Sequence, residues 1–110
     1  MPAKNFDDYL SKTLREDSAF ASEYLNQALA DSEHAFLVAL RKVSQANGGL
    51  TKLAGKTRIG RQSLYRMFSH GGNPTVSSLL TVLAGLGLSL TVSPYKKRTR
   101  RNKVRQKIAA

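Results

Sequence analysis

The chain has 110 residues, 41% of them apolar, and contains no cysteine and no tryptophan. This length suffices for one domain with one modest core. The absence of cysteine excludes disulfides, iron–sulfur clusters, thiol catalysis and zinc sites built on cysteine. With 18 basic against 7 acidic residues, the formal net charge is +11, which predicts a polyanionic partner, nucleic acid before an anionic membrane surface.

Two stretches of the sequence bear on export and membrane insertion. Residues 1–10 contain no apolar core of signal-peptide length. The longest nearly apolar run, residues 79–90, is too short to span a bilayer. We therefore expect a cytoplasmic protein with no membrane partner.

The charge is unevenly distributed along the chain. Residues 1–33 hold all seven acidic residues and three basic ones, a formal charge of −4. Residues 34–95 carry seven basic residues and no acid, and residues 96–110 carry eight more basic residues. We expect the middle and the tail to face a polyanion, and the first third to face solvent or a basic partner protein.

Apolar residues recur at helical spacing through the first half of the chain. This periodicity predicts a helix over 6–15, followed by two more helices. Ser18 and Ser32 are the expected N-caps of these two helices. Gly48 and Gly49 end the last of them, because glycine readily takes the positive φ common at helix C-termini.

Three shorter helices are expected in the second half. Thr51 is the expected N-cap of a helix that ends near Thr57. A second helix is predicted over 61–69. Thr75 is the expected N-cap of the third, which closes near Gly85.

Residues 88–93 show the alternation of a strand, with Leu88, Leu90 and Val92 separated by polar residues. A lone strand leaves its backbone donors and acceptors unpaired. We therefore predict a homodimer through residues 88–93, in which two copies of the strand pair. The alternative is an extended segment packed on the helical bundle.

The strongest local signal is a helix-turn-helix pattern. Ala54 supplies the small residue where a second helix crosses, Ile59 the buried residue of the turn, and Leu64 and Met67 the inward face of the second helix. Polar side chains occupy the outward face near its N-terminus, where arginine can bind guanine and glutamine can bind adenine in the major groove. The alternative is two core helices of an unrelated bundle. The outward side chains are Arg61, Gln62, Ser63 and Arg66.

Several longer motifs accompany this pattern. They include Leu53-Ala54, the run RQSLYR over 61–66, GNP over 72–74 and LAGLG over 83–87. With them, residues 6–93 resemble the HigA-type addiction-module antidote proteins, also called prophage DNA-binding proteins, which have a Cro/CI-like helix-turn-helix. The resemblance implies a bacterial dimeric repressor that binds a palindromic operator in its own promoter and neutralises a RelE-like toxin encoded next to it.

The resemblance also implies DNA-binding positions in the turn and the second helix. These recognition positions are Gly60, Arg61, Gln62, Ser63 and Arg66. Further expected DNA contacts come from Thr51, Lys52, Arg58 and Tyr65, although Tyr65 could equally pack against the protein. The family usually has glycine where this chain has Arg58, at a position that tends toward positive φ. Either the turn is slightly reshaped or Arg58 is retained to contact a phosphate.

Residues 94–110 form a basic tail with too little apolar material to fold alone, so we expect it to be disordered. It could contact DNA phosphates, bind RNA or have no partner. The residues expected to contact phosphate are Lys96, Lys97, Arg98, Arg100 and Arg101.

Few residues of the sequence are candidates for catalysis or metal binding. His34 and His70, 36 positions apart, are the only histidines and are expected to be ordinary helix-end residues. The acidic pairs 7–8 and 16–17 suit a solvated face or a docking surface for a basic toxin better than acid–base catalysis. We expect no catalytic residue, no metal, no cofactor and no enzyme activity.

The predicted fold is all-α: a small helical bundle with a Cro/CI-like helix-turn-helix, one C-terminal β-strand and a disordered basic tail. We divide it into N-terminal helices (1–34), a DNA-binding domain with the strand (35–93) and the tail (94–110). The expected function is a nucleoid-associated, DNA-binding antitoxin that represses its own operon. The alternatives are a prophage-type regulator without a toxin and a toxin-binding protein that binds DNA only non-specifically.

Overall fold

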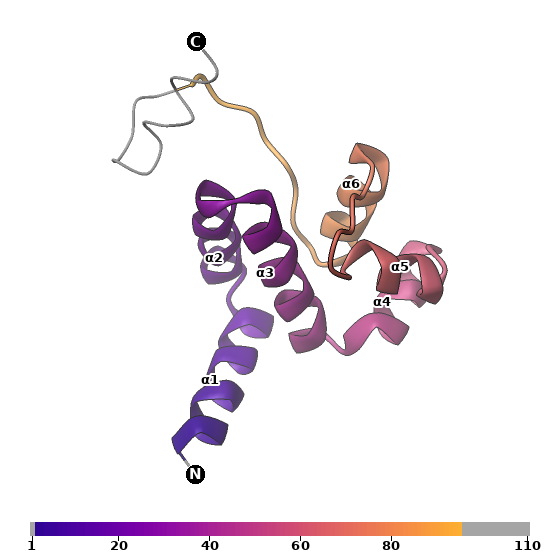
Figure 1. The fold of residues 1–110 in the computed structure, drawn as a ribbon. Coiled ribbons are helices and arrows are strands. Elements are labelled where there is room, and N and C mark those ends of the chain that lie inside the picture. The colour runs from indigo at the N-terminus through magenta and orange to yellow at the C-terminus, as the bar shows by residue number, and fades with distance from the viewer. Residues whose placement is uncertain (1, 96–110) are drawn as a thin grey trace.

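The structure, a computed structural model, describes residues 2–95, with side chains from residue 6 onward. Within this range the secondary structure consists of six α-helices and no strand (Figure 1). The all-α prediction is therefore confirmed for the described part of the chain. The helices are α1 (Pro2–Glu16), α2 (Ser18–Asp31), α3 (Glu33–Ala46), α4 (Gly49–Thr57), α5 (Arg61–Met67) and α6 (Val76–Gly85).

Helix α3 is the centre of the bundle. It packs against α1 and α2 on one side and against α4 on the other, while α5 and α6 pack on α4 (Figure 1). The acidic first third of the sequence thus lies on α1, α2 and the start of α3. The acid-free middle of the sequence occupies the rest of α3 and α4–α6.

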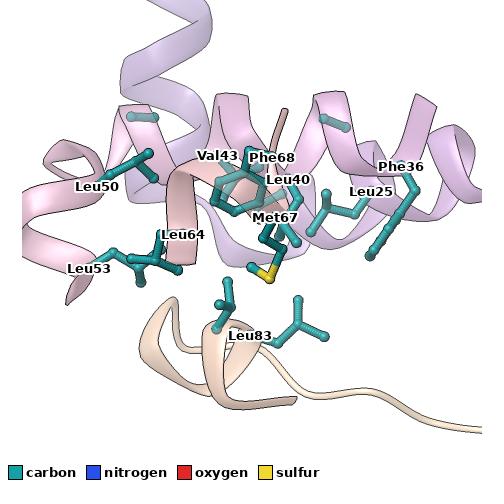
Figure 2. Close-up of a cluster of buried hydrophobic side chains, with 14 of the residues drawn as sticks. Leu25, Phe36, Leu40, Val43, Leu50, Leu53, Leu64, Met67, Phe68 and Leu83 are labelled. Carbon is teal, nitrogen blue, oxygen red and sulfur yellow. The ribbon is translucent and has the colours of Figure 1, made fainter. Parts of the chain in front are cut away.

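One continuous apolar core joins the two sides of α3. Leu40 and Val43 of α3 are almost fully buried, as are Leu64 of α5 and Val82 of α6. Figure 2 shows Leu40 and Val43 in the same cluster as Leu25 of α2 and Leu64 of α5. Because burial of apolar side chains is the main favourable term in folding, the two sides should fold as one unit.

Side-chain caps define where three helices begin. The Ser32 hydroxyl accepts a hydrogen bond from the Ala35 N–H (2.9 Å), and the Thr75 hydroxyl accepts one from the Ser78 N–H (3.0 Å), so both predicted N-caps are confirmed. The Ser18 prediction is wrong by one residue. Asp17 caps α2 instead, because its extended backbone lets its carboxylate accept from the Phe20 N–H at 3.0 Å.

The junction between α3 and α4 depends on two glycines. Gly48 and Gly49 have φ of 106° and 85°, which confirms the predicted end of α3. The Thr51 cap is wrong, because α4 already begins at Gly49 and Thr51 lies inside its first turn. Gly48 takes the N-cap position in the left-handed conformation, with no side-chain cap.

Gly85 brings α6 close to α4. A Cβ atom at this position would lie 2.9 Å from the Cγ2 atom of Thr57 and 3.2 Å from the Cδ1 atom of Leu53. A separation as short as 2.9 Å is one that real Cβ atoms almost never show. Gly85, the first glycine of the LAGLG motif, therefore allows α6 to pack closely against the first helix of the predicted helix-turn-helix.

The predicted strand over 88–93 is not present among the described residues, and this prediction is wrong. The Leu88 N–H donates to the Leu83 carbonyl (2.8 Å), and the Leu88 side chain packs against the core. Val92, by contrast, is 96% exposed. The alternation of the sequence becomes a strand only where a second strand supplies backbone partners, and the six helices supply none. The alternative, a segment packed on the bundle, describes Leu88 but not Val92.

Candidate nucleic-acid interface

Helices α4 and α5 are joined by a three-residue turn, Arg58 to Gly60. Arg58 has φ 64° and ψ 12°, which confirms the positive φ expected at this position. Its N–H donates to the Ala54 carbonyl at 3.0 Å and so ends α4. A non-glycine residue adopts this conformation at a cost of about 1 kcal/mol. The sharp end of α4 therefore depends on Arg58 holding a conformation that glycine adopts more easily.

The turn is held by side-chain hydrogen bonds as well. The Thr57 hydroxyl donates to the Leu53 carbonyl (2.8 Å) and accepts from the Ile59 N–H (3.2 Å). Ile59 is half-buried and packs against the core, and Ala54 packs against the core as well. These contacts set the direction in which α5 leaves the turn.

Helix α5 has a buried face and an exposed face. Leu64 is fully buried and Met67 nearly so, as predicted. Tyr65 is 54% exposed, so its ring is not part of the core. The side chains predicted to contact DNA from α5 are all exposed: Arg61, Gln62, Ser63, Tyr65 and Arg66.

Two predicted site residues from different helices meet at the start of α5. The Nη1 atom of Arg61 donates a hydrogen bond of 3.2 Å to the Thr51 hydroxyl in the first turn of α4. Both side chains are exposed, as is the neighbouring Lys52. Gly60 occupies the N-cap position of α5 and is exposed as well. The fold thus brings the first turn of α4 and the start of α5 together in one polar surface.

This surface is positively charged. Arg58, Arg61 and Arg66 join Lys52 and Lys56 on α4, α5 and the turn, and all five side chains are exposed. No acidic residue occurs between residues 34 and 95. Arginine side chains can bind phosphate oxygens and the acceptor atoms of guanine through several N–H groups at once. The arrangement is chemically suited to bind a nucleic acid.

A cleft of about 420 Å³ adjoins this surface, between the end of α5 and the start of α6. Ser63, Arg66, Thr75 and Ser78 contribute hydroxyls and a guanidinium to its lining. The sequence alone did not indicate this cleft, because it is formed when the loop over 68–75 brings the two helix ends together.

The structure also brings His34 and His70 into contact, although the sequence does not indicate that they are neighbours. His34, in the first turn of α3, contacts His70, just after α5, with ring centroids 5.9 Å apart and the rings edge to face. Among residues 2–95 there is no group of three or more potential metal ligands. We therefore assign the pair no role beyond this contact.

Some predictions cannot be located in the structure. Lys96, Lys97, Arg98, Arg100 and Arg101 lie outside the described residues, together with the rest of the tail from 96 to 110. Among the described helices, none is long and apolar enough to cross a membrane.

Comparison with known proteins identifies the family. Searches among curated proteins and among solved structures each returned no match. The family model for the probable addiction module antidote protein matches residues 3–94. This match covers nearly all of the six helices and the segment that follows α6. The chain therefore belongs to the family of probable addiction module antidote proteins.

Proposed function

We propose that the protein is a sequence-specific DNA-binding antitoxin of the HigA type, with α4 and α5 forming a Cro/CI-like helix-turn-helix. It binds a palindromic operator as a homodimer, represses its own operon and neutralises a RelE-like toxin encoded next to it. Toxin binding is assigned to the N-terminal helices and to the face of α3 that packs on them, DNA binding to α4 and α5, and additional phosphate contacts to residues 94–110. This division is one of function, because a single core joins the helices of the first two parts.

One observation carries the DNA-binding proposal: the left-handed turn at Arg58 holds α5 so that its cationic and amide side chains face outward. Recognition helices of this type insert their N-terminal side chains into the major groove. Arg61 and Gln62 stand at that end of α5 and have the donor and acceptor groups for guanine and adenine.

The dimer proposal rests on exposed apolar residues near the end of the described chain. Leu80 and Leu90 are each 44% exposed, and Val92 is 96% exposed. Exposed apolar side chains favour association between copies, and a palindromic operator requires two copies of α5. Sedimentation of the wild type against Leu90→Lys tests this dimer. A wild-type monomer at micromolar concentration would contradict it.

The experiment for DNA binding is a titration into a duplex from upstream of the gene and into a scrambled duplex, across a salt series. We expect tighter binding to the upstream duplex. Arg61→Ala should lose about 1–3 kcal/mol of this discrimination, the value of one bidentate base contact. Lys56→Ala is the control, and it should weaken binding to both duplexes equally. Equal, salt-sensitive binding of the wild type to both duplexes would contradict sequence-specific recognition.

The tail is tested in the same titration with a chain that ends at Pro94. For each phosphate that the shortened chain no longer neutralises, the salt dependence of the binding constant should fall by about 0.9 log units per log unit of salt. We expect lower affinity for all duplexes alike. An unchanged salt dependence would contradict a phosphate-binding tail.

A further inference from the structure

A second surface feature lies on the opposite side of α3 from the candidate DNA-binding helices. It is a groove of about 610 Å³ lined only by residues of α2 and α3. Phe20 and Tyr24 line it from α2, with ring centroids 6.3 Å apart in a stacked arrangement. Val38 lines it from α3 and is 54% exposed. The groove therefore presents a partly exposed aromatic pair and a more exposed branched aliphatic side chain, and such side chains are characteristic of interaction surfaces.

The charged residues of this groove are acidic. Glu23 and Asp31 line it from α2, and both are exposed. The Glu23 carboxylate accepts a hydrogen bond of 3.1 Å from the Gln27 amide, which lines the groove as well. None of the described side chains that line it belongs to Lys, Arg or His. The groove thus combines apolar contact area with negative charge.

This charge contrasts with that of the whole protein. A cationic partner is repelled by the net charge of +11, but the first third of the chain carries −4. Charges further apart than about 8 Å are largely screened at physiological salt, so Glu23 and Asp31, which line the groove, act on a partner there more strongly than distant charges do. Electrostatic complementarity of this kind selects the partner and speeds its association.

The groove is separate from the candidate DNA-binding surface. It shares no lining residue with α4, α5 or the turn between them. In Figure 1, α2 and α5 lie on opposite sides of α3. A partner in the groove would therefore leave Arg61 and its neighbours accessible to DNA.

We propose that the groove between α2 and α3 is the docking site for a cationic segment of the toxin that also presents an apolar side chain. The apolar side chain packs between Tyr24 and Val38, while lysine or arginine side chains face Glu23 and Asp31. This inference rests on the proposed function, because it assumes that the antidote has a toxin partner.

The first test uses the full chain and, as the probe, the protein encoded by the adjacent gene. Val38→Arg places a large cation in the groove at an already exposed position. We expect it to weaken binding of the probe by about thirtyfold or more, the loss typical of a central interface residue. The matched control is Leu29→Arg, which makes the same kind of change at a position on α2 that is 40% exposed and outside the groove. We expect this control to bind the probe like the wild type.

The second test concerns charge. Glu23→Lys and Asp8→Lys change the net charge equally, at exposed helical positions inside and outside the groove respectively. Only Glu23→Lys should slow association with the probe, by about tenfold at low salt, with the difference shrinking as salt rises. Both variants should keep wild-type helicity and should bind DNA with equal affinity.

The outcomes separate this inference from the proposed function. If the wild type binds the probe and Val38→Arg binds it equally well, the groove is not the docking site, although toxin binding stands. If the wild type does not bind the probe at all, the proposed toxin neutralisation fails and the inference fails with it. If Val38→Arg instead converts a dimer into a monomer in sedimentation, the groove is an interface between copies, which also overturns the inference.

Discussion

The acidic and the basic sides of the protein pack on the same helix but are built differently. On the acidic side, α1 and α2 have 15 and 14 residues, and the helix starts at Asp17 and Ser32 are fixed by side-chain caps. On the basic side, α4 and α5 have only 9 and 7 residues, and left-handed residues, Gly48 and Arg58, mark the start and the end of α4.

The two sides therefore hold their surface side chains in place by different means. Helices as short as α4 and α5 are not stable alone in water, so their geometry depends on buried side chains such as Leu53 and Leu64 and on the turn at Arg58. The longer helices of the acidic side pack against α3, and α2 and α3 leave a groove between them. The basic side is therefore suited to hold a few polar side chains in fixed positions, and the acidic side to accept a segment of a partner.

The largest expected effect on stability comes from a substitution in the apolar core that the acidic and basic sides share. Leu40 is fully buried at the middle of α3. Leu40→Ala should lower the free energy of unfolding by about 2–5 kcal/mol, because it removes buried atoms and leaves a cavity. Urea unfolding followed by NMR signals from Tyr24 and Tyr65 should give one transition on both sides. Val38→Ala, at an exposed position on the same helix, should change stability by less than about 0.5 kcal/mol.

A single core would be contradicted if the signals from the acidic side of Leu40→Ala persisted at urea concentrations that abolished those of the basic side. The two sides would then be separate folding units, each with its own stability.

The next effect concerns the caps of the acidic side. Asp17→Ala should destabilise the protein by about 1 kcal/mol, because the N–H of Phe20 loses its side-chain acceptor. Ser18→Ala, one position along, should be nearly neutral, since Ser18 is already the first residue of α2. Thermal unfolding of both variants measures the difference. A larger loss for Ser18→Ala would restore the cap position that the sequence pattern indicated.

On the basic side, the corresponding change is Arg58→Gly. It should raise the free energy of unfolding by about 1 kcal/mol, because glycine adopts the left-handed conformation without the cost of a Cβ atom. DNA affinity should fall at the same time, since the exposed guanidinium is removed. Chemical unfolding and DNA titration measure the two effects. A more stable protein with unchanged DNA affinity would show that Arg58 does not contact phosphate.

The smallest effect sharpens the role of the contact between α4 and α5. Thr51→Val removes the hydroxyl that accepts a hydrogen bond from Arg61. The Arg61 guanidinium should then be less ordered. We expect a loss of about 0.5–1 kcal/mol in discrimination between the upstream and scrambled duplexes, the net value of one hydrogen bond. Stability should hardly change. Thr51→Ser keeps the hydroxyl and should restore discrimination, whereas equal losses in both variants would exclude a positioning role for this hydroxyl.

Several features could be predicted from sequence because they depend on neighbouring residues. Helical periodicity located all six helices to within a few residues, and the Ser32 and Thr75 caps follow from local hydrogen bonds. The positive φ at Arg58 followed from its place in the family motif. The caps at Ser18 and Thr51 failed by a few residues at most, since Asp17 and Gly48 offered nearby alternatives.

The strand over 88–93 failed for a different reason. Alternation of apolar and polar residues records which side chains seek burial, but a strand also needs backbone partners. In the described part of the chain these partners are absent. Leu88 packs against the core, whereas Leu90 and Val92 stay exposed.

Sequence alone predicts the helices, the separation of acidic from basic residues and the outward polar face of α5, because each is encoded within a few neighbouring positions or in composition. Contacts between distant residues, by contrast, depend on the tertiary structure. Arg61 reaches Thr51 across a turn, His34 meets His70 across 36 positions, and α2 and α3 enclose an acidic groove. These contacts follow from how the helices pack around α3, and packing depends on the shapes of many side chains at once rather than on any local pattern.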